Sequence, residues 1–263
     1  MSSPPPRDPP WTIWDVALLA LVIFVAVNTF VLAGFAVAIA AQMDGASVDQ
    51  LVKEGHVNRP VIERLLSDFR IVVPAQLLSY IVGFAFMQAI VRVRYRKSFW
   101  ETLRWSWPQG RWWPYPLIGS AMAIAAAALG KFLPVPKSMP IDKLFQSPAA
   151  GYSLAAFAVL VAPLMEELFF RGFLYPVLAR GIGVAGAIAL TGFCFALMHA
   201  SQLAASWGPL LVLFLVGVIL TTIRALARSV AASTVTHMAY NLFIFLMMWL
   251  ASDHFHHMER LQP

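Results

Sequence analysis

The sequence is poor in charge: only 12% of its 263 residues are charged, whereas 60% are hydrophobic. A soluble globular domain has about a quarter charged residues and is nearer half apolar. The deficit excludes an intrinsically disordered chain, a coiled coil and an ordinary cytosolic enzyme, because each needs more polar surface. Lipid is therefore the main solvent of this chain, and the length suits one domain of several spanning helices.

Several other features are missing. The chain has one cysteine, Cys194, which excludes an intrachain disulfide framework and a cysteine-rich zinc site. It has no Walker loop, GxGxxG, HExxH or GxSxG, so it carries no signature of a nucleotide site, a zincin or a serine hydrolase. No basic segment precedes the first apolar run, which predicts a retained span rather than a signal peptide.

Seven apolar runs predict membrane-spanning helices. They are Val16–Ala41, Ile71–Val91, Tyr115–Leu133, a run from Tyr152 toward Arg180, Val184–His199, Pro209–Ile223 and Val230–Leu250. A short amphipathic helix at the membrane interface is expected after Pro60. An eighth, irregular or re-entrant segment stays open. The predicted fold is an all-α polytopic transmembrane bundle of about seven to eight spans.

The net charge of +6 needs an explanation. In a soluble protein it would suggest nucleic acid, but here the basic residues gather in 92–111, and five tryptophans lie in 100–113. Arginine and tryptophan together are typical of the cytoplasmic headgroup layer. We therefore expect no nucleic-acid partner, an N-terminus inside and residues 42–70 outside; seven spans would leave the C-terminus outside.

The chain divides into four stretches within one membrane domain. We expect a disordered proline-rich tail at 1–10, N-terminal spans with the basic loop at 11–150, a catalytic core at 151–250 and a polar tail at 251–263.

Ionisable groups inside a membrane are costly and suggest function. The first group is EELFFR, in which Glu167 and Arg171 stand at i, i+4 and can pair on one helix face. Glu166 points about 100° away and has no partner in its own helix. Glu167 and Arg171 are thus interpreted as a structural lock, and Glu166 as a free carboxylate suited to general acid or base work.

Two further motifs, FALMH and HMAYN, carry the pairs Phe195/His199 and His237/Asn241 at i, i+4. A single membrane histidine such as His199 is more often a packing residue bonded to a neighbouring helix. A buried His–Asn pair is harder to explain by packing alone. Counting residues along each helix, with a turn at 180–183, places Glu166, His199 and His237 at compatible depths.

Two chemistries fit these side chains. In the first, Glu166 takes a proton from water, His199 orients that water, and His237 and Asn241 donate to the oxyanion of a carbonyl. In the second, Glu166, His199 and His237 hold a catalytic zinc ion with an open position. The side-chain types alone do not choose between them.

The three motifs, in this order on separate predicted spans, resemble the CAAX-protease and bacteriocin-processing (CPBP) family of intramembrane proteases. The resemblance covers roughly 152–250 and implies a catalytic Glu166, a water-holding His199 and oxyanion stabilisation by His237 and Asn241. It implies supporting roles for the remaining motif residues, Glu167, Arg171 and Phe195. The family is often called metalloproteases, although a metal-free glutamate mechanism has also been argued for it.

The sequence therefore predicts an intramembrane endopeptidase that cleaves a membrane-anchored protein or peptide, in the inner membrane of a bacterium. No cofactor is required by the residues, and Zn²⁺ is the alternative. Two other functions stay open. One is a proton-coupled transporter or channel that uses Glu166, His199 and His237 as a relay. The other is a non-catalytic scaffold that binds a partner's transmembrane tail.

Overall fold

The computed structural model describes residues 8–41, 52–53, 56–57, 59–107 and 112–261. Within these ranges the secondary structure is helical, apart from a short antiparallel ladder between β1 (Val52–Lys53) and β2 (His56–Val57). Five helical segments are long and apolar enough to cross a membrane. The chain is thus a multi-pass membrane protein with the all-α bundle that its composition predicts.

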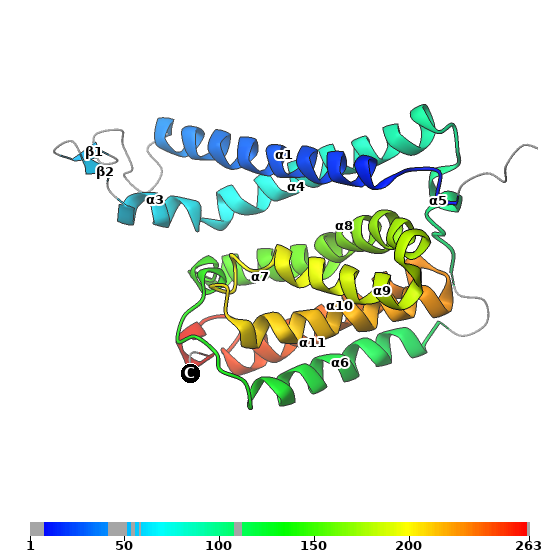
Figure 1. The fold of residues 1–263 in the computed structure, drawn as a ribbon. Helices are drawn as coiled ribbons and strands as arrows, with labels where there is room; N and C mark the ends of the chain where they lie inside the picture. Colours follow the sequence, from blue (N-terminus) through cyan, green and yellow to red (C-terminus); the bar gives the residue numbers. More distant parts are fainter. Residues whose placement is uncertain (1–7, 42–51, 54–55, 58, 108–111, 262–263) are drawn as a thin grey trace, which may run out of the picture.

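Two long helices, α1 (Ile13–Ala40) and α4 (Phe69–Gln88), lie side by side and form one layer, which we call the hairpin (Figure 1). The amphipathic helix expected after Pro60 is α3 (Arg59–Leu66), which leads into α4. Asp68 begins α4 by accepting a hydrogen bond from the backbone amide of Arg70 at 2.9 Å. At its far end α4 continues as a π-helical turn, η2 (Ala89–Arg94).

The chain then passes through the short α5 (Phe99–Thr102) to α6 (Pro114–Gly130) and on to a helical bundle. After the 3₁₀ turn η3, the bundle comprises α7 to α11, and α6 packs along α11. The bounds are η3 Pro140–Leu144, α7 Pro148–Ala156, η4 Phe157–Val161, α8 Ala162–Glu167, η5 Leu168–Leu174, α9 Tyr175–Met198, α10 Trp207–Ala227, α11 Val230–Ala251 and a final 3₁₀ turn η6 Met258–Leu261. Both η4 and η5 are π-helical.

A glycine reverses the chain inside the long apolar segment Pro148–Met198. Gly183 has φ 77° and ψ 167°, a backbone conformation that side chains disfavour, and it splits α9 into two helices. This is the turn that the sequence predicts at 180–183. Figure 1 shows α7 and α8 running one way and α9 returning, so the segment makes two passes. With α1, α4, α10 and α11, this gives six passes through segments that are long and apolar enough to cross a membrane, and the 17-residue α6 packs along α11. The count is thus roughly the seven to eight predicted. The two described ends lie at opposite ends of the bundle (Figure 1).

Part of the tail predicted at 1–10 lies within the described residues. Residues 1–7 lie outside the described ranges, but Asp8 already pairs with Arg104 at 2.9 Å. Trp11 is fully buried, donates its indole N–H to the carbonyl of Phe173 at 3.0 Å, and stacks on the Phe173 ring at 4.5 Å. The chain therefore contacts the bundle from residue 8 onward.

The polar tail predicted at 251–263 contains one buried side chain that packs against the bundle. Phe255 is buried and meets the ring of Tyr152 edge-on at 5.3 Å. It lies so close to Gly151 that a Cβ there would be 2.5 Å from the Phe255 Cγ. Hydropathy missed this contact because one phenylalanine among polar residues carries no periodic signal.

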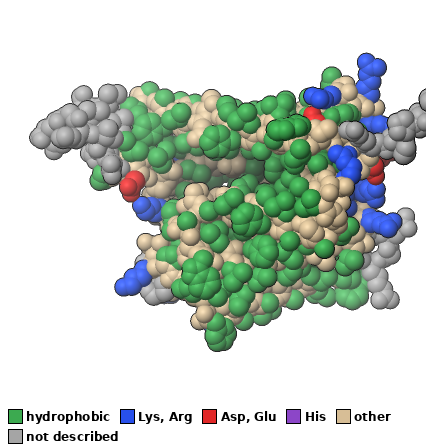
Figure 2. All heavy atoms as spheres, in the orientation of Figure 1, with side chains coloured by type: hydrophobic (Ala, Val, Ile, Leu, Met, Phe, Trp, Pro, Cys, Tyr) green, Lys and Arg blue, Asp and Glu red, His purple; other side chains and the backbone are tan. Residues whose placement is uncertain are grey.

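The core centres on η5, in which all but one of the seven residues are buried. Phe170, Phe173 and Leu174 pack there against side chains from the hairpin, α9 and α10. Outside this core, hydrophobic side chains cover the long face of the molecule, while Lys and Arg gather at its ends, above all near α5 (Figure 2). This distribution is expected for a bundle whose long sides face lipid.

Candidate active site

Glu167 and Arg171 form a wholly buried ion pair. Arg171 Nη1 lies 2.8 Å from Glu167 Oε1, and neither side chain is exposed. This is the pair that the i, i+4 spacing predicts. Because a buried charge without a partner is strongly destabilising, each residue depends on the other.

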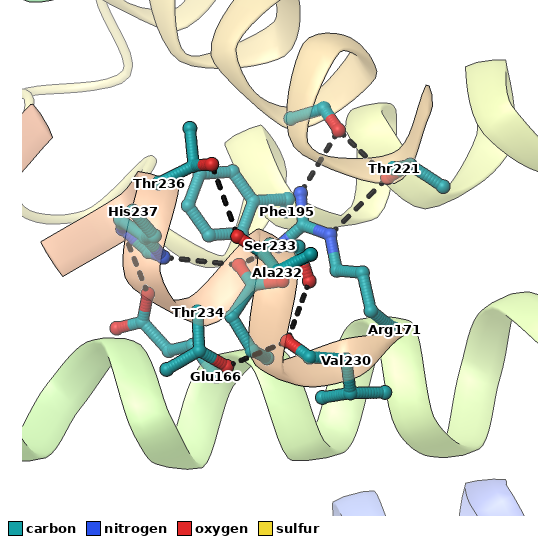
Figure 3. A network of polar contacts seen from close by, with 12 residues as sticks. Glu166, Arg171, Phe195, Thr221, Val230, Ala232, Ser233, Thr234, Thr236 and His237 are labelled. Carbon is teal, nitrogen blue, oxygen red and sulfur yellow. Dashed lines mark hydrogen bonds and ion pairs between the residues drawn. The ribbon is translucent and has the colours of Figure 1, made fainter. Parts of the chain in front are cut away.

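The guanidinium of Arg171 also ties η5 to α10. Its Nη2 donates to the carbonyl of Gly217 at 2.9 Å, and its Nε donates to the hydroxyl of Thr221 at 3.2 Å (Figure 3). Gly217 faces Gly192 of α9 so closely that a Cβ on Gly217 would lie 2.8 Å from the Gly192 Cα. The two glycines let α9 and α10 approach and hold the Gly217 carbonyl in reach of the arginine.

His237 of α11 lies between the two glutamates. Its Nδ1 is 3.0 Å from Glu167 Oε1, and its Nε2 is 3.8 Å from Glu166 Oε2. A carboxylate on one ring nitrogen fixes the orientation of an imidazole and stabilises its protonated form. Glu167 thus serves both Arg171 and His237, while the second nitrogen of His237 is directed to Glu166.

Glu166 is the more accessible of the two acids. Its side chain is 12% exposed, against none for Glu167. The 3.8 Å separation between Glu166 and His237 is too long for a direct hydrogen bond, but it suits two groups that share a bridging water or a substrate oxygen. The difference between the two carboxylates is the one expected from their positions around the helix.

His199 caps the end of α9, where its Nδ1 bonds the carbonyl of Phe195 at 2.8 Å. The Phe195 ring lies 4.9 Å from the His199 ring and 5.7 Å from the His237 ring. The guanidinium carbon of Arg171 stands 4.8 Å from the same ring. Phe195 thus contacts both histidines and Arg171. Among the described residues, no direct hydrogen bond joins His199 to Glu166.

Asn241 lies one helical turn beyond His237 and is turned toward η4. Its Nδ2 donates to the carbonyl of Ala158 at 2.7 Å. A π-helical turn disturbs the regular backbone pairing, and such turns are frequent at functional sites. Here η4 and η5 flank α8, the short helix that carries Glu166 and Glu167.

The hydroxyl groups near His237 are occupied by their own helix. Ser233 and Thr234 both donate to the carbonyl of Val230, at 3.0 and 2.9 Å, and Thr236 donates to Ala232 at 3.0 Å (Figure 3). Such bonds to the preceding turn let polar side chains face a dry interior. They keep the buried face of α11 polar without adding ligands to the site.

One aromatic contact beside the site was not predicted from the sequence. Tyr80 of α4 stacks on Phe157 of η4 at 5.7 Å. The only available signal was the polar pair Gln76 and Tyr80 at i, i+4 within an apolar run. Thr221 and Gly217 were also missed, because nothing in the sequence relates α10 to Arg171.

The zinc alternative requires Glu166, His199 and His237 to gather around one point. Within the described part of the chain, no three His, Cys, Asp or Glu side chains are grouped so that they could hold a metal ion. Only Glu166 and His237 approach each other among the three. As arranged, the residues do not form a three-ligand set, and no step of the mechanism below passes through a metal.

Residues 148–243 match the family model described as type II CAAX prenyl endopeptidase Rce1-like. This segment is therefore similar to an Rce1-like domain, and we call it the Rce1-like domain. It contains all three motifs, and the resemblance to CAAX-type proteases is confirmed over these residues. The Rce1-like domain runs from the start of α7 into α11, so the hairpin and α6 lie outside it. Comparisons with curated proteins and with solved structures gave no significant match.

Proposed function

We propose that this protein is an intramembrane endopeptidase in which Glu166 activates a water molecule to hydrolyse a peptide bond of a membrane-anchored substrate. The observation that carries the proposal is the position of His237 between a buried, paired Glu167 and an accessible Glu166, inside an Rce1-like domain. An acid left free beside an oriented histidine is the arrangement that general base catalysis needs.

In the first step, Glu166 accepts a proton from water as the water oxygen bonds to the carbonyl carbon of the substrate. The carbonyl electrons move to its oxygen, and protonated His237, held by Glu167, donates Nε2–H to this oxyanion. The oxyanion then collapses, the C–N bond breaks, and the leaving amine takes the proton from Glu166. Glu166 thus acts as base and then as acid.

His199 and Asn241 have less direct roles in this scheme. We assign His199 to orienting the water, because its ring contacts Phe195, which also contacts His237. Asn241 binds η4 with one amide hydrogen and retains a second for the oxyanion.

The orientation follows from the charged end of the bundle. We place the basic segment around α5 in the cytoplasm of a bacterium, with the catalytic carboxylates reached from within its plasma membrane.

The test is cleavage of a quenched peptide that ends in a farnesylated cysteine and three further residues, by purified protein in liposomes. Glu166→Gln should lower kcat at least about 100-fold, since the base is lost. Glu63→Gln is the matched control, because Glu63 is exposed and distant from the site. Equal cleavage by Glu166→Gln and the wild type would contradict the proposal; a loss of proton uptake instead would favour a transporter.

Treatment with a metal chelator tests whether the activity needs a metal ion. If Glu166 works without a metal, treatment with 1,10-phenanthroline leaves kcat unchanged. Inactivation that added Zn²⁺ reverses would support the zinc alternative instead.

A further inference from the structure

One buried arginine has no part in the proposed mechanism. Arg224 stands in the last turn of α10 and is only 5% exposed. Within the described part of the chain it makes no ion pair or hydrogen bond, and its Nε is fully buried without an acceptor. Its guanidinium carbon lies 5.8 Å from the ring centre of Tyr175. Such a contact uses the face of the guanidinium, so the N–H groups in its plane still lack acceptors.

A buried charge of this kind calls for an anion. Buried polar atoms in folded proteins nearly always have partners, and a buried charge that lacks one is strongly destabilising. Residues 1–7 and 108–111, which lie outside the described ranges, contain no Asp or Glu. The two Nη nitrogens of Arg224 are not fully buried, unlike its Nε, so a group from outside the chain can reach them.

A cavity of about 500 Å³ lies at the basic end of the molecule, one helical turn beyond Arg224 (Figure 2). Two contacts hold its walls together. The amide of Val230 donates to the carbonyl of Arg104 at 3.1 Å, and the hydroxyl of Ser229 donates to the carbonyl of Ser106. The segment after α5 is thus fixed against the turn that follows α10. The walls carry four charged side chains and two tryptophans, namely Asp8, Glu101, Arg104, Arg228, Trp100 and Trp105.

The charges around this cavity do not cancel. Arg104 pairs with Asp8 at 2.9 Å, which neutralises both. Among the described residues, Arg224 and Arg228 have no acidic partner and Glu101 has no basic one, so two positive charges against one negative leave +1. Because α10 ends and α11 begins here, their opposed dipoles largely offset each other, and the side chains decide the field.

We propose that this cavity binds the phosphate of an anionic phospholipid, and that Arg224 and Arg228 are its ligands. A phosphodiester carries one negative charge and two free oxygens, which guanidinium groups bind well. It would cancel the surplus charge, whereas the ammonium of a zwitterionic head group would restore it.

The surroundings of the cavity favour a lipid. The rings of Trp100 and Trp105 lie 5.4 Å apart at its wall, and tryptophan is typical of the headgroup layer. Basic pockets between spanning helices hold lipid head groups, and the volume lies in the range of sites for small ligands. The site does not depend on the proposed peptidase activity.

The first experiment follows thermal unfolding of the full chain in detergent while phosphatidylglycerol or phosphatidylcholine is added. Phosphatidylglycerol should raise Tm in a saturable way, since a ligand of the folded state stabilises it, and phosphatidylcholine should raise it much less. Arg224→Met should weaken the Kd for phosphatidylglycerol at least about 10-fold. Arg228→Gln, at an exposed position, should weaken it about threefold. The control Arg92→Met also removes an exposed arginine and should change it less than about twofold.

The protein without added lipid gives a test of opposite sign. There Arg224→Met removes an unpaired buried charge, so the variant should unfold at a higher temperature than the wild type. With saturating phosphatidylglycerol the order should reverse. An arginine that only supports the packing of α10 would instead make the variant the less stable protein under both conditions.

Four results would overturn the proposal. The first is equal stabilisation by the two lipids, and the second is a loss of affinity in Arg92→Met as large as that in Arg224→Met. The third is an Arg224→Met variant that is less stable than the wild type with and without lipid. The fourth is full stabilisation by inorganic phosphate alone, which would assign the site to a free ion and reject the lipid. None of these measurements uses peptide cleavage, so they stand apart from the test of the proposed function.

Discussion

The first and last spanning helices of the described chain differ in the share of their residues that is buried. In the apolar window of α1 17% of the residues are buried, against 44% in α11. The exposed side of α1 is a lipid-facing surface that includes Trp14, Phe24 and Leu32. The buried side of α11 carries hydroxyls and His237. The more apolar helix, α1, forms a lipid-facing wall, whereas the less apolar α11 carries the polar groups of a site that only neighbouring helices can cover.

The largest loss of stability is expected when a buried charge inside the bundle loses its partner. Arg171→Met removes the partner of Glu167 and the bonds to α10, and should cost about 4 kcal/mol of stability. Thermal unfolding in detergent measures it, with Arg92→Met at an exposed position as the control.

The double variant Glu167→Gln/Arg171→Met should recover part of that stability, because no buried charge is then left without a partner. If the double variant were as unstable as Arg171→Met alone, packing rather than charge would explain the loss.

Substitutions at the N-terminal end of the described chain should reduce stability only where the side chain contacts the bundle. Trp11→Ala removes a buried ring that stacks on and bonds to Phe173, and should cost about 3 kcal/mol. Trp14→Ala, whose ring is 79% exposed, should stay within about 0.5 kcal/mol of the wild type. Similar effects of the two changes would mean that the hairpin does not depend on this contact.

The seam between α6 and α11 tests how tightly the site helix is held. A Cβ on Gly119 would meet the Ala239 Cβ and the Tyr240 nitrogen, each at 2.9 Å, whereas one on Gly130 would meet nothing within 4 Å. Gly119→Ala should therefore destabilise by about 2 kcal/mol and shift α11. Gly130→Ala, the same change on the same helix, should be neutral or slightly stabilising. Unfolding and cleavage rates of the two variants give the comparison.

The smallest effect lies at the start of α4. The side-chain hydrogen bond from Arg70 lowers the pKa of Asp68 below its usual 3.8. A carboxyl whose folded pKa lies below its unfolded pKa stabilises the protein above the unfolded value. That stability is lost as pH falls through the folded pKa, here from about pH 4 downward.

Asp68→Asn keeps the helix cap and should remove this acid-dependent part of the stability, about 1 kcal/mol at most because Arg70 is well exposed. Denaturant unfolding of both proteins at pH 3 and pH 6 compares the two slopes. Parallel pH dependence of variant and wild type would assign the acid sensitivity to other carboxyls.

The spans and the buried ion pair could be predicted from the sequence. Long apolar runs show where helices cross, and i, i+4 spacing brings Glu167 to Arg171 whatever the neighbours are. Gly183 was recognisable as a turn because it lies between two apolar runs. These features depend on local sequence alone.

What escaped prediction depends on contacts between distant helices. In lipid both faces of a helix are apolar, so periodicity does not reveal which face is inside, and the contact of Tyr80 with Phe157 could not be predicted. Asn241 of α11 binds the carbonyl of Ala158 in the π-helical turn η4, a contact between helices that local spacing does not show. The packing of Phe255 against Gly151 could not be predicted, because no sequence pattern relates these two residues.

The packing of Phe255 against Gly151 and Tyr152 has a consequence for the order in which the protein folds during its synthesis. The chain leaves the ribosome from its N-terminal end, and α11 follows every other spanning helix that the structure describes. Glu166 is therefore in the membrane well before His237 arrives, and α7 is fastened only when the segment after α11 folds back on it. With this order of synthesis, the proposed catalytic centre stays incomplete until the last spanning helix of the described chain is inserted.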